Sequence, residues 1–156
     1  MIDAELAAFV EGKVMVVFGA ADAAGRPMIG RAAGARCAGR DEVDVFVSRT
    51  RWGEVTEELR VGARVAVTFS RPTDYRTFQL KGVLTAITPS EPADVAAAAR
   101  YIETVTESLV ALGVLQPQVD QWLACDDLIT LRFRSGVIFA QTPGPGAGAP
   151  LARALR

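Results

Sequence analysis

The sequence of 156 residues contains no histidine and only two cysteines. Without histidine, the chain cannot build a Ser-His-Asp triad, a His-ligated zinc site or a His-ligated haem. Cys37 and Cys125 lie far apart with no Cys-x-x-Cys spacing, so we expect neither a disulfide framework nor a metal site. If the protein is an enzyme, a cofactor is expected to carry its chemistry.

Long apolar runs and an excess of basic residues are also missing. No apolar stretch approaches the roughly 18 to 20 residues that are needed to span a bilayer. The formal net charge of −1 and the pI near 5.5 argue against a general nucleic-acid binder. The acidic N-terminal segment MIDAELAAFVEGK lacks the basic start and the cleavage site of a secretory signal. These features predict a soluble, cytoplasmic protein with no membrane partner and no nucleic-acid partner.

Apolar residues make up half of the sequence, and their spacing predicts a mainly antiparallel β protein with a few helices. The predicted strands cover residues 13–21, 28–36, 43–48, 63–70, 76–88 and 128–140. The last of them is interpreted either as one bent strand or as a hairpin at Ser135 and Gly136. The predicted helices cover residues 3–11, 50–61, 90–113 and a short segment around Trp122. We therefore expect an α+β fold, a small barrel of six or seven strands.

The segment 90–113 is the most clearly marked helix. Ser90 is its predicted N-cap, Pro92 stands in the first turn, and Gly113 follows the last turn. Apolar residues at steps of three and four form one stripe: Val95, Ala98, Ile102, Val105, Leu109 and Leu112. This stripe is expected to pack against the sheet or, alternatively, to form a helix seam in a dimer.

The chain is predicted to form one domain followed by a tail. The domain covers residues 1–140, a length that can bury a core without disulfides or metals. Residues 141–156, with the sequence QTPGPGAGAPLARALR, are rich in Gly and Pro and are expected to be flexible or extended. The sequence shows no repeat and no sign of a second domain.

The segment FSRPTDYRTFQLKG concentrates hydrogen-bonding side chains on one face of a predicted strand. Alternation with period two places Thr77, Gln79 and Lys81 on one face, and Phe78 and Leu80 on the other. One interpretation is the solvated outer face of an antiparallel sheet. The other is a face that binds a ligand.

Four segments, in this order, carry a resemblance to a known family: FVEGKVMVVFGAADAAGRPMIGRA, VDVFVSRTRW, EELRVGARVAVTF and YRTFQLKG. In the first of them a short helix leads to a strand and an Asp-x-x-Gly-x-Pro turn. Over roughly residues 6–88 the chain resembles the pyridoxamine 5'-phosphate oxidase family, the FMN-binding split barrels. The resemblance implies a homodimer of mostly antiparallel, six- or seven-stranded split β-barrels with a few peripheral helices. It also implies that FMN lies in a groove between the two subunits.

The resemblance further implies a set of cofactor-binding residues. In this family the flavin phosphate is held by the second strand and by the segment after the third strand. The residues at these places in this chain are Arg31, Arg36, Ser48, Arg49, Thr50, Arg51 and Trp52. The polar face of the strand over residues 76–88 would border the flavin, through Thr77, Gln79 and Lys81. The residues alone also allow a second interpretation, in which the segment 48–51 is an ordinary helix cap and Trp52 is a core side chain.

Departures from the family pattern restrict the function that we expect. Counting back from LRVGARV places Glu54 within the family's phosphate motif, where a carboxylate opposes phosphate binding. The oxidase that makes pyridoxal phosphate uses Arg and His to hold its substrate, and this chain has no His. Genuine pyridoxamine-phosphate oxidase activity is therefore not expected.

The resulting hypothesis is an FMN-dependent oxidoreductase that acts as a homodimer on an unidentified small molecule. No catalytic residue and no metal ligand is assigned. Two alternatives stay open. One is a non-catalytic module that binds flavin or another phosphorylated ligand, and the other, supported by Glu54, is a family member that has lost flavin.

Overall fold

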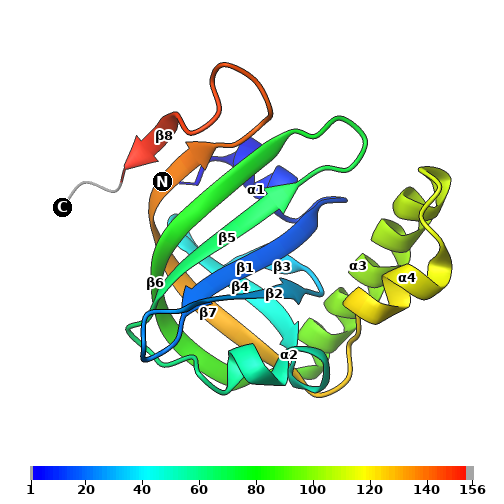
Figure 1. Cartoon of the computed structure of the whole chain (residues 1–156), viewed down its shortest axis with the longest axis horizontal. Coiled ribbons are helices and arrows are strands. Elements are labelled where there is room, and N and C mark those ends of the chain that lie inside the picture. Colours follow the sequence, from blue (N-terminus) through cyan, green and yellow to red (C-terminus); the bar gives the residue numbers. More distant parts are fainter. Residues whose placement is uncertain (1, 154–156) are drawn as a thin grey trace.

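A computed structural model of the chain describes residues 2–153. Within them the chain forms eight strands and four helices (Figure 1). Their bounds in chain order are α1 (Ala4–Val10), β1 (Met15–Ala21), β2 (Pro27–Ala32), β3 (Ala35–Cys37), β4 (Glu42–Ser48), α2 (Arg49–Thr56), β5 (Arg64–Ser70), β6 (Thr77–Pro89), α3 (Pro92–Ala111), α4 (Gln116–Trp122), β7 (Leu128–Ala140) and β8 (Pro150–Arg153). The last three residues of the predicted tail lie outside the described residues. No helix in the described part of the chain is long and apolar enough to cross a membrane.

The strands form one antiparallel sheet in the order β2-β1-β5-β6-β7-β4-β3, with β8 paired to β7. The two edge strands, β2 and β3, follow each other in the chain, and the link between them bonds to β4. Ala33 donates its N–H to the Phe46 carbonyl at 2.7 Å, and Phe46 donates to the Gly34 carbonyl at 3.1 Å. The sheet therefore closes on itself, and the predicted α+β barrel is confirmed, with eight strands in place of six or seven.

Two differences explain the higher number of strands. The strand predicted over residues 28–36 is divided at Gly34, which has a φ of +107°. A Cβ at this position would lie 3.0 Å from the ring of Tyr101, so the close approach of α3 requires glycine here. In addition, Pro150–Arg153 of the predicted tail pairs with β7 as the short strand β8.

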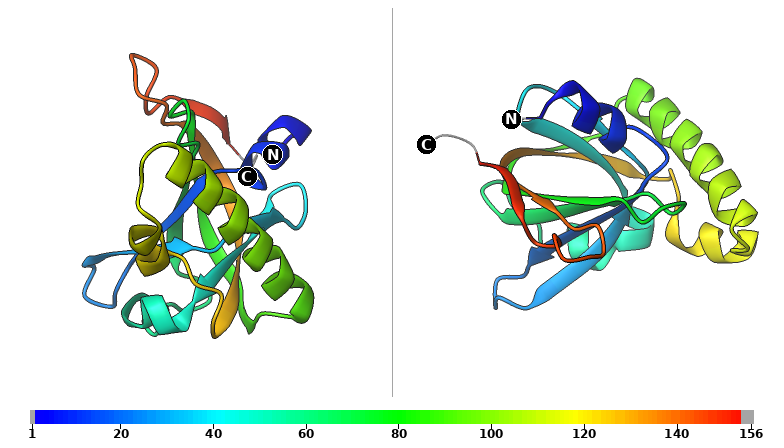
Figure 2. Two further views of the ribbon diagram at one scale, coloured as in Figure 1. Left: turned by 90° about the vertical axis from the view of Figure 1, so that its right-hand side faces the viewer. Right: turned by 90° about the horizontal axis from the view of Figure 1, so that it is seen from above.

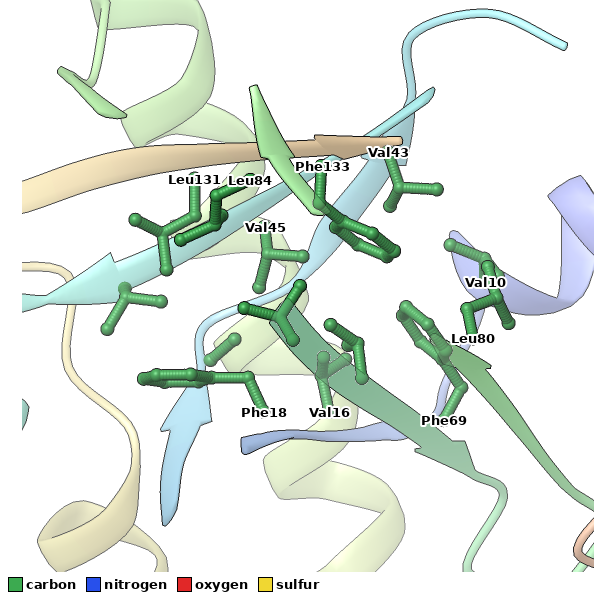
Figure 3. Packing of buried hydrophobic residues seen from close by; sticks show 14 of the residues in the cluster. Val10, Val16, Phe18, Val43, Val45, Phe69, Leu80, Leu84, Leu131 and Phe133 are labelled. Carbon is green, nitrogen blue, oxygen red and sulfur yellow. The ribbon is translucent and has the colours of Figure 1, made fainter. Parts of the chain in front are cut away.

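Alternate side chains of the strands fill the barrel. Figure 3 shows Val16 and Phe18 of β1, Phe69 of β5 and Leu80 of β6 in one cluster, and each of them is at most 2% exposed. The long strand β7 pairs with β6 and shifts its register opposite Gly82, which confirms a bent strand and not a hairpin. The intervening side chains of these strands point away from the core.

The N-terminal helix predicted over residues 3–11 is α1, which packs against this core. Asp3 caps the helix by accepting a hydrogen bond from the Leu6 N–H at 2.8 Å. Phe9 and Val10 are buried, and the Phe9 ring meets the Phe78 ring edge-on with 4.9 Å between centroids. The predicted helix is therefore confirmed, and Phe9 and Val10 lie on the side that faces the core.

The helices α3 and α4 lie together on one side of the barrel (Figure 2). Glu91, and not the predicted Ser90, is the N-cap of α3, and its N–H lies 3.4 Å from the Asp94 carboxylate. The Ser90 hydroxyl instead bonds to Thr130 of β7 at 2.8 Å between the two oxygens. The Ser90 prediction was wrong because this side chain is bonded to the sheet and is not available to the helix end.

The apolar stripe of α3 is buried only in its middle. Its buried members are Ala98, Val105 and Leu109. Val95 is 38% exposed and Leu112 is 52% exposed, so the predicted burial was wrong for both ends of the stripe. The first half of the stripe packs on the sheet at Phe46, and the second half packs on α4.

Candidate functional site

The outward side chains of β2, β1, β5 and β6 form a surface that we call the open face. The strand register aligns them in two rows, which are Arg31, Val17, Thr68 and Gln79, and Ile29, Gly19, Ala66 and Lys81. Adjacent strands lie about 4.8 Å apart, so Arg31 and Gln79 at the two ends of the first row are about 14 Å apart. The sheet therefore brings three predicted site residues, Arg31, Gln79 and Lys81, onto one surface.

The second row of the open face is the floor of a shallow hollow. Gly19 and Ala66 contribute little side chain to it, and Lys81 and Val83 border it. Ile29 is 65% exposed and Val83 is 42% exposed, although both are large apolar residues. With Gly19 and Ala66 between them, these residues give the hollow a mainly apolar lining.

The strand that carries Gln79 and Lys81 has the predicted alternation, because Leu80 between them is fully buried. Gln79 donates from Nε2 to the hydroxyl of Thr68, its neighbour in the row, at 3.0 Å. The Lys81 Nζ lies 5.0 Å from the centroid of the Phe139 ring. The polar face therefore points to the outside of the barrel, with its ammonium group held over an aromatic ring.

Thr77, the third predicted residue of this strand, is buried at the end of β6. Its hydroxyl lies 2.8 Å from the Ser70 hydroxyl and donates to the Tyr75 carbonyl at 2.8 Å. Thr142 accepts a hydrogen bond from the Thr77 N–H at 3.0 Å. These bonds hold the turn between β5 and β6, so the polar atoms of Thr77 already have partners within the chain.

Arg31 lies at the other end of the first row, next to α4. Its guanidinium carbon is 4.4 Å from the centroid of the Trp122 ring, a cation–π contact. Burial lowers the pKa of Arg31, and the nearby Tyr101 opposes this shift. Arg31 is thus a half-buried cation at the border of the open face.

The N-terminal end of α2 adjoins the open face through a second hollow. Thr50, Arg51 and Trp52 line this hollow together with Glu54 and with Ile29 of the open face. Trp52 also packs against the barrel core, as the core interpretation of this side chain predicted. Three predicted site residues therefore meet in one hollow, and a carboxylate lines the hollow with them.

Two acidic residues between α4 and β7 bind this end of α2. Arg49 donates to both carboxylate oxygens of Asp127, at 2.6 Å from Nη2 and 3.1 Å from Nε. The Ser48 hydroxyl lies 3.4 Å from the Asp126 carboxylate. The nearby Thr50 side chain is the chief reason that the pKa of Asp126 lies below its ordinary value. We call these residues the α2 cluster: Ser48, Arg49, Thr50, Arg51, Asp126 and Asp127.

Arg36 belongs to a different group of charges. It donates to Asp44 at 2.9 Å and pairs with Asp94 at 2.8 Å, and Arg132 donates to the same Asp44. Asp44 and Ser48 lie four residues apart on β4, a distance of about 13 Å along an extended strand. The structure therefore does not bring Arg36 together with the α2 cluster.

Sequence reasoning missed four side chains of this region: Thr68, Trp122, Asp126 and Asp127. Thr68 could have been found from the sequence, because alternation along the strand predicted over residues 63–70 places it on the face that points away from the core. The two aspartates could not, because their partners lie 78 residues earlier in the chain. Their contact depends on how the barrel closes.

The two parts of the site fit a flavin unequally. The flat floor at Gly19 and Ala66, with Gln79 and Lys81 beside it, suits a planar ring that needs apolar contact and a few polar groups. The α2 cluster presents arginine and hydroxyl groups that suit a phosphate. However, carboxylates of the same chain already bind several of these groups.

No protein-family model matches the chain, and no curated protein is detectably similar to it in sequence. Among solved structures, HupZ of Group A Streptococcus matches with a TM-score of 0.54 and 15% identity, over 95% of this chain and 100% of that chain. An F420 reductase matches with a TM-score of 0.54 and 13% identity, over 84% of this chain and 93% of that chain. A candidate pyridoxamine 5'-phosphate oxidase of Lactobacillus delbrueckii has a TM-score of 0.49 and 14% identity, over 81% of this chain and 84% of that chain.

These matches concern the fold, because the sequence identities are low. The first two cover most of both chains. The observed architecture, a mostly antiparallel sheet with four helices, agrees with that of these neighbours. The chain therefore has the split-barrel fold of pyridoxamine 5'-phosphate oxidase-like proteins.

Proposed function

We propose that this protein binds FMN and acts as an oxidoreductase on a small molecule. The observation that carries the proposal is the continuity between the open face and the hollow at the N-terminal end of α2. Ile29 belongs to both, so a ligand with a flat ring and an anionic tail can contact the two surfaces at once. The resemblance in sequence and the F420 reductase among the solved structures support a flavin-type cofactor.

In this proposal the ring lies on the floor at Gly19 and Ala66, where small residues allow close contact. The Gln79 amide provides hydrogen bonds at the ring edge, and Lys81 provides a positive charge. A bound flavin supplies the transfer of a hydride or of electrons, and a cation near its ring favours the reduced state. At the other end, Thr50 and Arg51 hold the phosphate.

We further propose that the functional unit is a homodimer. Ile29 and Val83 leave apolar surface exposed on the open face, and a second copy of the chain would cover this surface and enclose the cofactor. An obligate dimer commonly buries more than about 2,000 Å² in total. Light scattering at micromolar concentration is expected to give the mass of a dimer, and a monomer would contradict this part of the proposal.

The visible absorption spectrum of the purified protein tests the cofactor directly. A flavoprotein is yellow, and added FMN is expected to lose fluorescence when it binds. Reduced nicotinamide is then tested as electron donor by following the bleaching of the flavin. A colourless protein that does not quench FMN would overturn the proposal.

The second candidate is a member of this fold that binds a ligand without catalysis or has lost flavin. The observation that favours it is the presence of carboxylates where a phosphate would bind. Glu54 lines the hollow at the N-terminal end of α2, and Asp127 is bonded to Arg49. Tight FMN binding without turnover with reduced nicotinamide would support a binding module. Absence of any flavin binding would support loss of the cofactor.

A further inference from the structure

The groups at the N-terminal end of α2 that suit a phosphate already hold anions from their own chain. Arg49 makes a two-point contact with the Asp127 carboxylate, with N–O distances of 2.6 and 3.1 Å. The Ser48 hydroxyl lies 3.4 Å from the Asp126 carboxylate, and the nearby Thr50 side chain lowers the pKa of Asp126. A carboxylate and a phosphate use the same charge-assisted hydrogen bonds, so the two compete for these donors.

We infer that Asp126 and Asp127 act as internal competitors of an anionic ligand at the α2 cluster, and that they determine which ligands the site accepts. The identity of the ligand rests on the proposed function. With both carboxylates in place, the phosphate of FMN gains less from these donors than it would gain without them. Neutralising the carboxylates is expected to strengthen the binding of FMN relative to that of riboflavin, which ends in an uncharged hydroxyl.

Backbone contacts keep Asp127, and with it the neighbouring Asp126, close to Arg49. The Arg49 N–H donates to the Asp127 carbonyl at 3.1 Å, so the backbone as well as the side chain joins the two segments. Asp127 has a φ of +46°, a conformation that only glycine, asparagine and aspartate adopt with ease. A competitor attached in this way has a high effective concentration at the site.

The pair is nevertheless open to exchange. The Arg49 side chain is 53% exposed and the Asp127 side chain is 51% exposed. Exposed ion pairs of this kind are weak, because water competes for both partners and salt screens the charges. A phosphate that reaches the α2 cluster can therefore replace the Asp127 carboxylate, although Glu54 in the adjoining hollow repels it.

The sharpest test removes the two charges and keeps the shape. The double variant Asp126→Asn, Asp127→Asn retains the side-chain volume, and asparagine tolerates the left-handed backbone at position 127. Its matched control is Asp74→Asn, because Asp74 pairs with Arg71 at the same N–O distance of 2.6 Å and is also about half exposed. This control pair lies in the turn between β5 and β6, at the other end of the barrel from α2 (Figure 1).

The three proteins are titrated with FMN and with riboflavin, which lacks the phosphate, and flavin fluorescence is recorded. The double variant is expected to bind FMN roughly tenfold more tightly than the wild type, the size of one charge-assisted interaction. Riboflavin affinity is expected to stay nearly unchanged in all three proteins. Unchanged or weaker FMN binding by a folded double variant, checked by circular dichroism, would overturn the inference.

A second measurement is independent of flavin. Inorganic phosphate is added to the same three proteins, and the midpoint of thermal unfolding is measured. A ligand that binds the folded state raises this midpoint, so phosphate is expected to stabilise the double variant more than the wild type and the control. If phosphate does so but no flavin binds, the proposed function is wrong and the inference stands. If phosphate stabilises all three proteins equally, the inference is wrong whatever the flavin result.

Discussion

Asp44 and Asp127 each bind an arginine through both carboxylate oxygens, yet they differ in exposure. The Asp44 side chain is fully buried, and it accepts hydrogen bonds from Arg132 at 2.7 and 2.9 Å and from Arg36 at 2.9 Å. The Asp127 side chain is 51% exposed and has Arg49 as its partner. The same chemical pair is therefore held in two environments.

Asp44 belongs to a structural network, whereas Asp127 lies where one bound anion can be exchanged for another. The network around Asp44 extends through Arg36 to Asp94, whose carboxylate also accepts from Thr130 at 3.1 Å, and so it joins α3 to the sheet. Water cannot reach Asp44 to replace its partners, and breaking such a buried pair is costly. At Asp127, water or another anion can take the place of either partner. Burial, and not the type of residue, decides which group of charges can respond to a ligand.

The largest expected effect is that of Asp44→Ala on stability. Removing the buried carboxylate is expected to lower the free energy of unfolding by about 3 kcal/mol, the low end for a broken buried pair. The low end applies because Arg36 and Arg132 are 44% and 42% exposed and can recover water. Urea unfolding measures the change, and Asp74→Ala in the exposed turn is the control. A loss no larger than that of the control would remove the distinction between the two groups.

Acid is expected to act on the same carboxylate. Burial opposes ionisation of Asp44, but hydrogen bonds from Arg132 and Arg36 outweigh it, so its pKa lies below the ordinary value of 3.8. A depressed pKa contributes stability that is present above the ordinary pKa and is lost as the pH falls through the lower, folded-state value. Unfolding free energies at pH 6, about 4 and about 3 are expected to fall more steeply for the wild type than for Asp44→Asn. Equal slopes would show that other carboxylates dominate acid unfolding.

At the exposed α2 cluster, the expected effect of a substitution is on ligand binding. Arg51→Ala is expected to weaken FMN binding about tenfold, because one charge-assisted bond to the phosphate is lost. Arg100→Ala, which removes an exposed guanidinium on α3, is the matched control and is expected to leave the affinity unchanged. Flavin fluorescence quenching measures both variants. An Arg51→Ala variant that binds FMN like the wild type would exclude Arg51 as a phosphate ligand.

The smallest expected effect is that of Arg49→Ala on stability. Because the Arg49–Asp127 pair is half exposed, its loss is expected to leave the midpoint of thermal unfolding within experimental error of the wild type. The same variant is expected to free the Asp127 carboxylate, while the backbone bond to the Asp127 carbonyl stays. A marked fall in the midpoint would mean that the α2 cluster is structural, like the network around Asp44, and would weaken the case for exchange.

Much of the fold was predictable because local spacing encodes it. Period-two alternation placed Leu80 in the core and Gln79 and Lys81 on the outside, and both placements are confirmed. Steps of three and four predicted the helix that ends before Gly113. The errors lie where a distant contact overrides the local pattern. Ser90 bonds to the sheet in place of the helix end, and Gly34 divides a strand where α3 approaches.

The sequence by itself determined most of the elements and the inward face of the long strands, because a period of two or 3.6 residues is enough to separate inside from outside. It also determined which side chains can bind an anion. Only the tertiary structure decided which of them are free to do so. Arg36 is joined to buried Asp44 across β3 and β4, whereas Arg49 meets an exposed Asp127 from 78 residues later. Ion pairs have no sequence period, so their partners and their burial depend on how the closed sheet brings distant segments together.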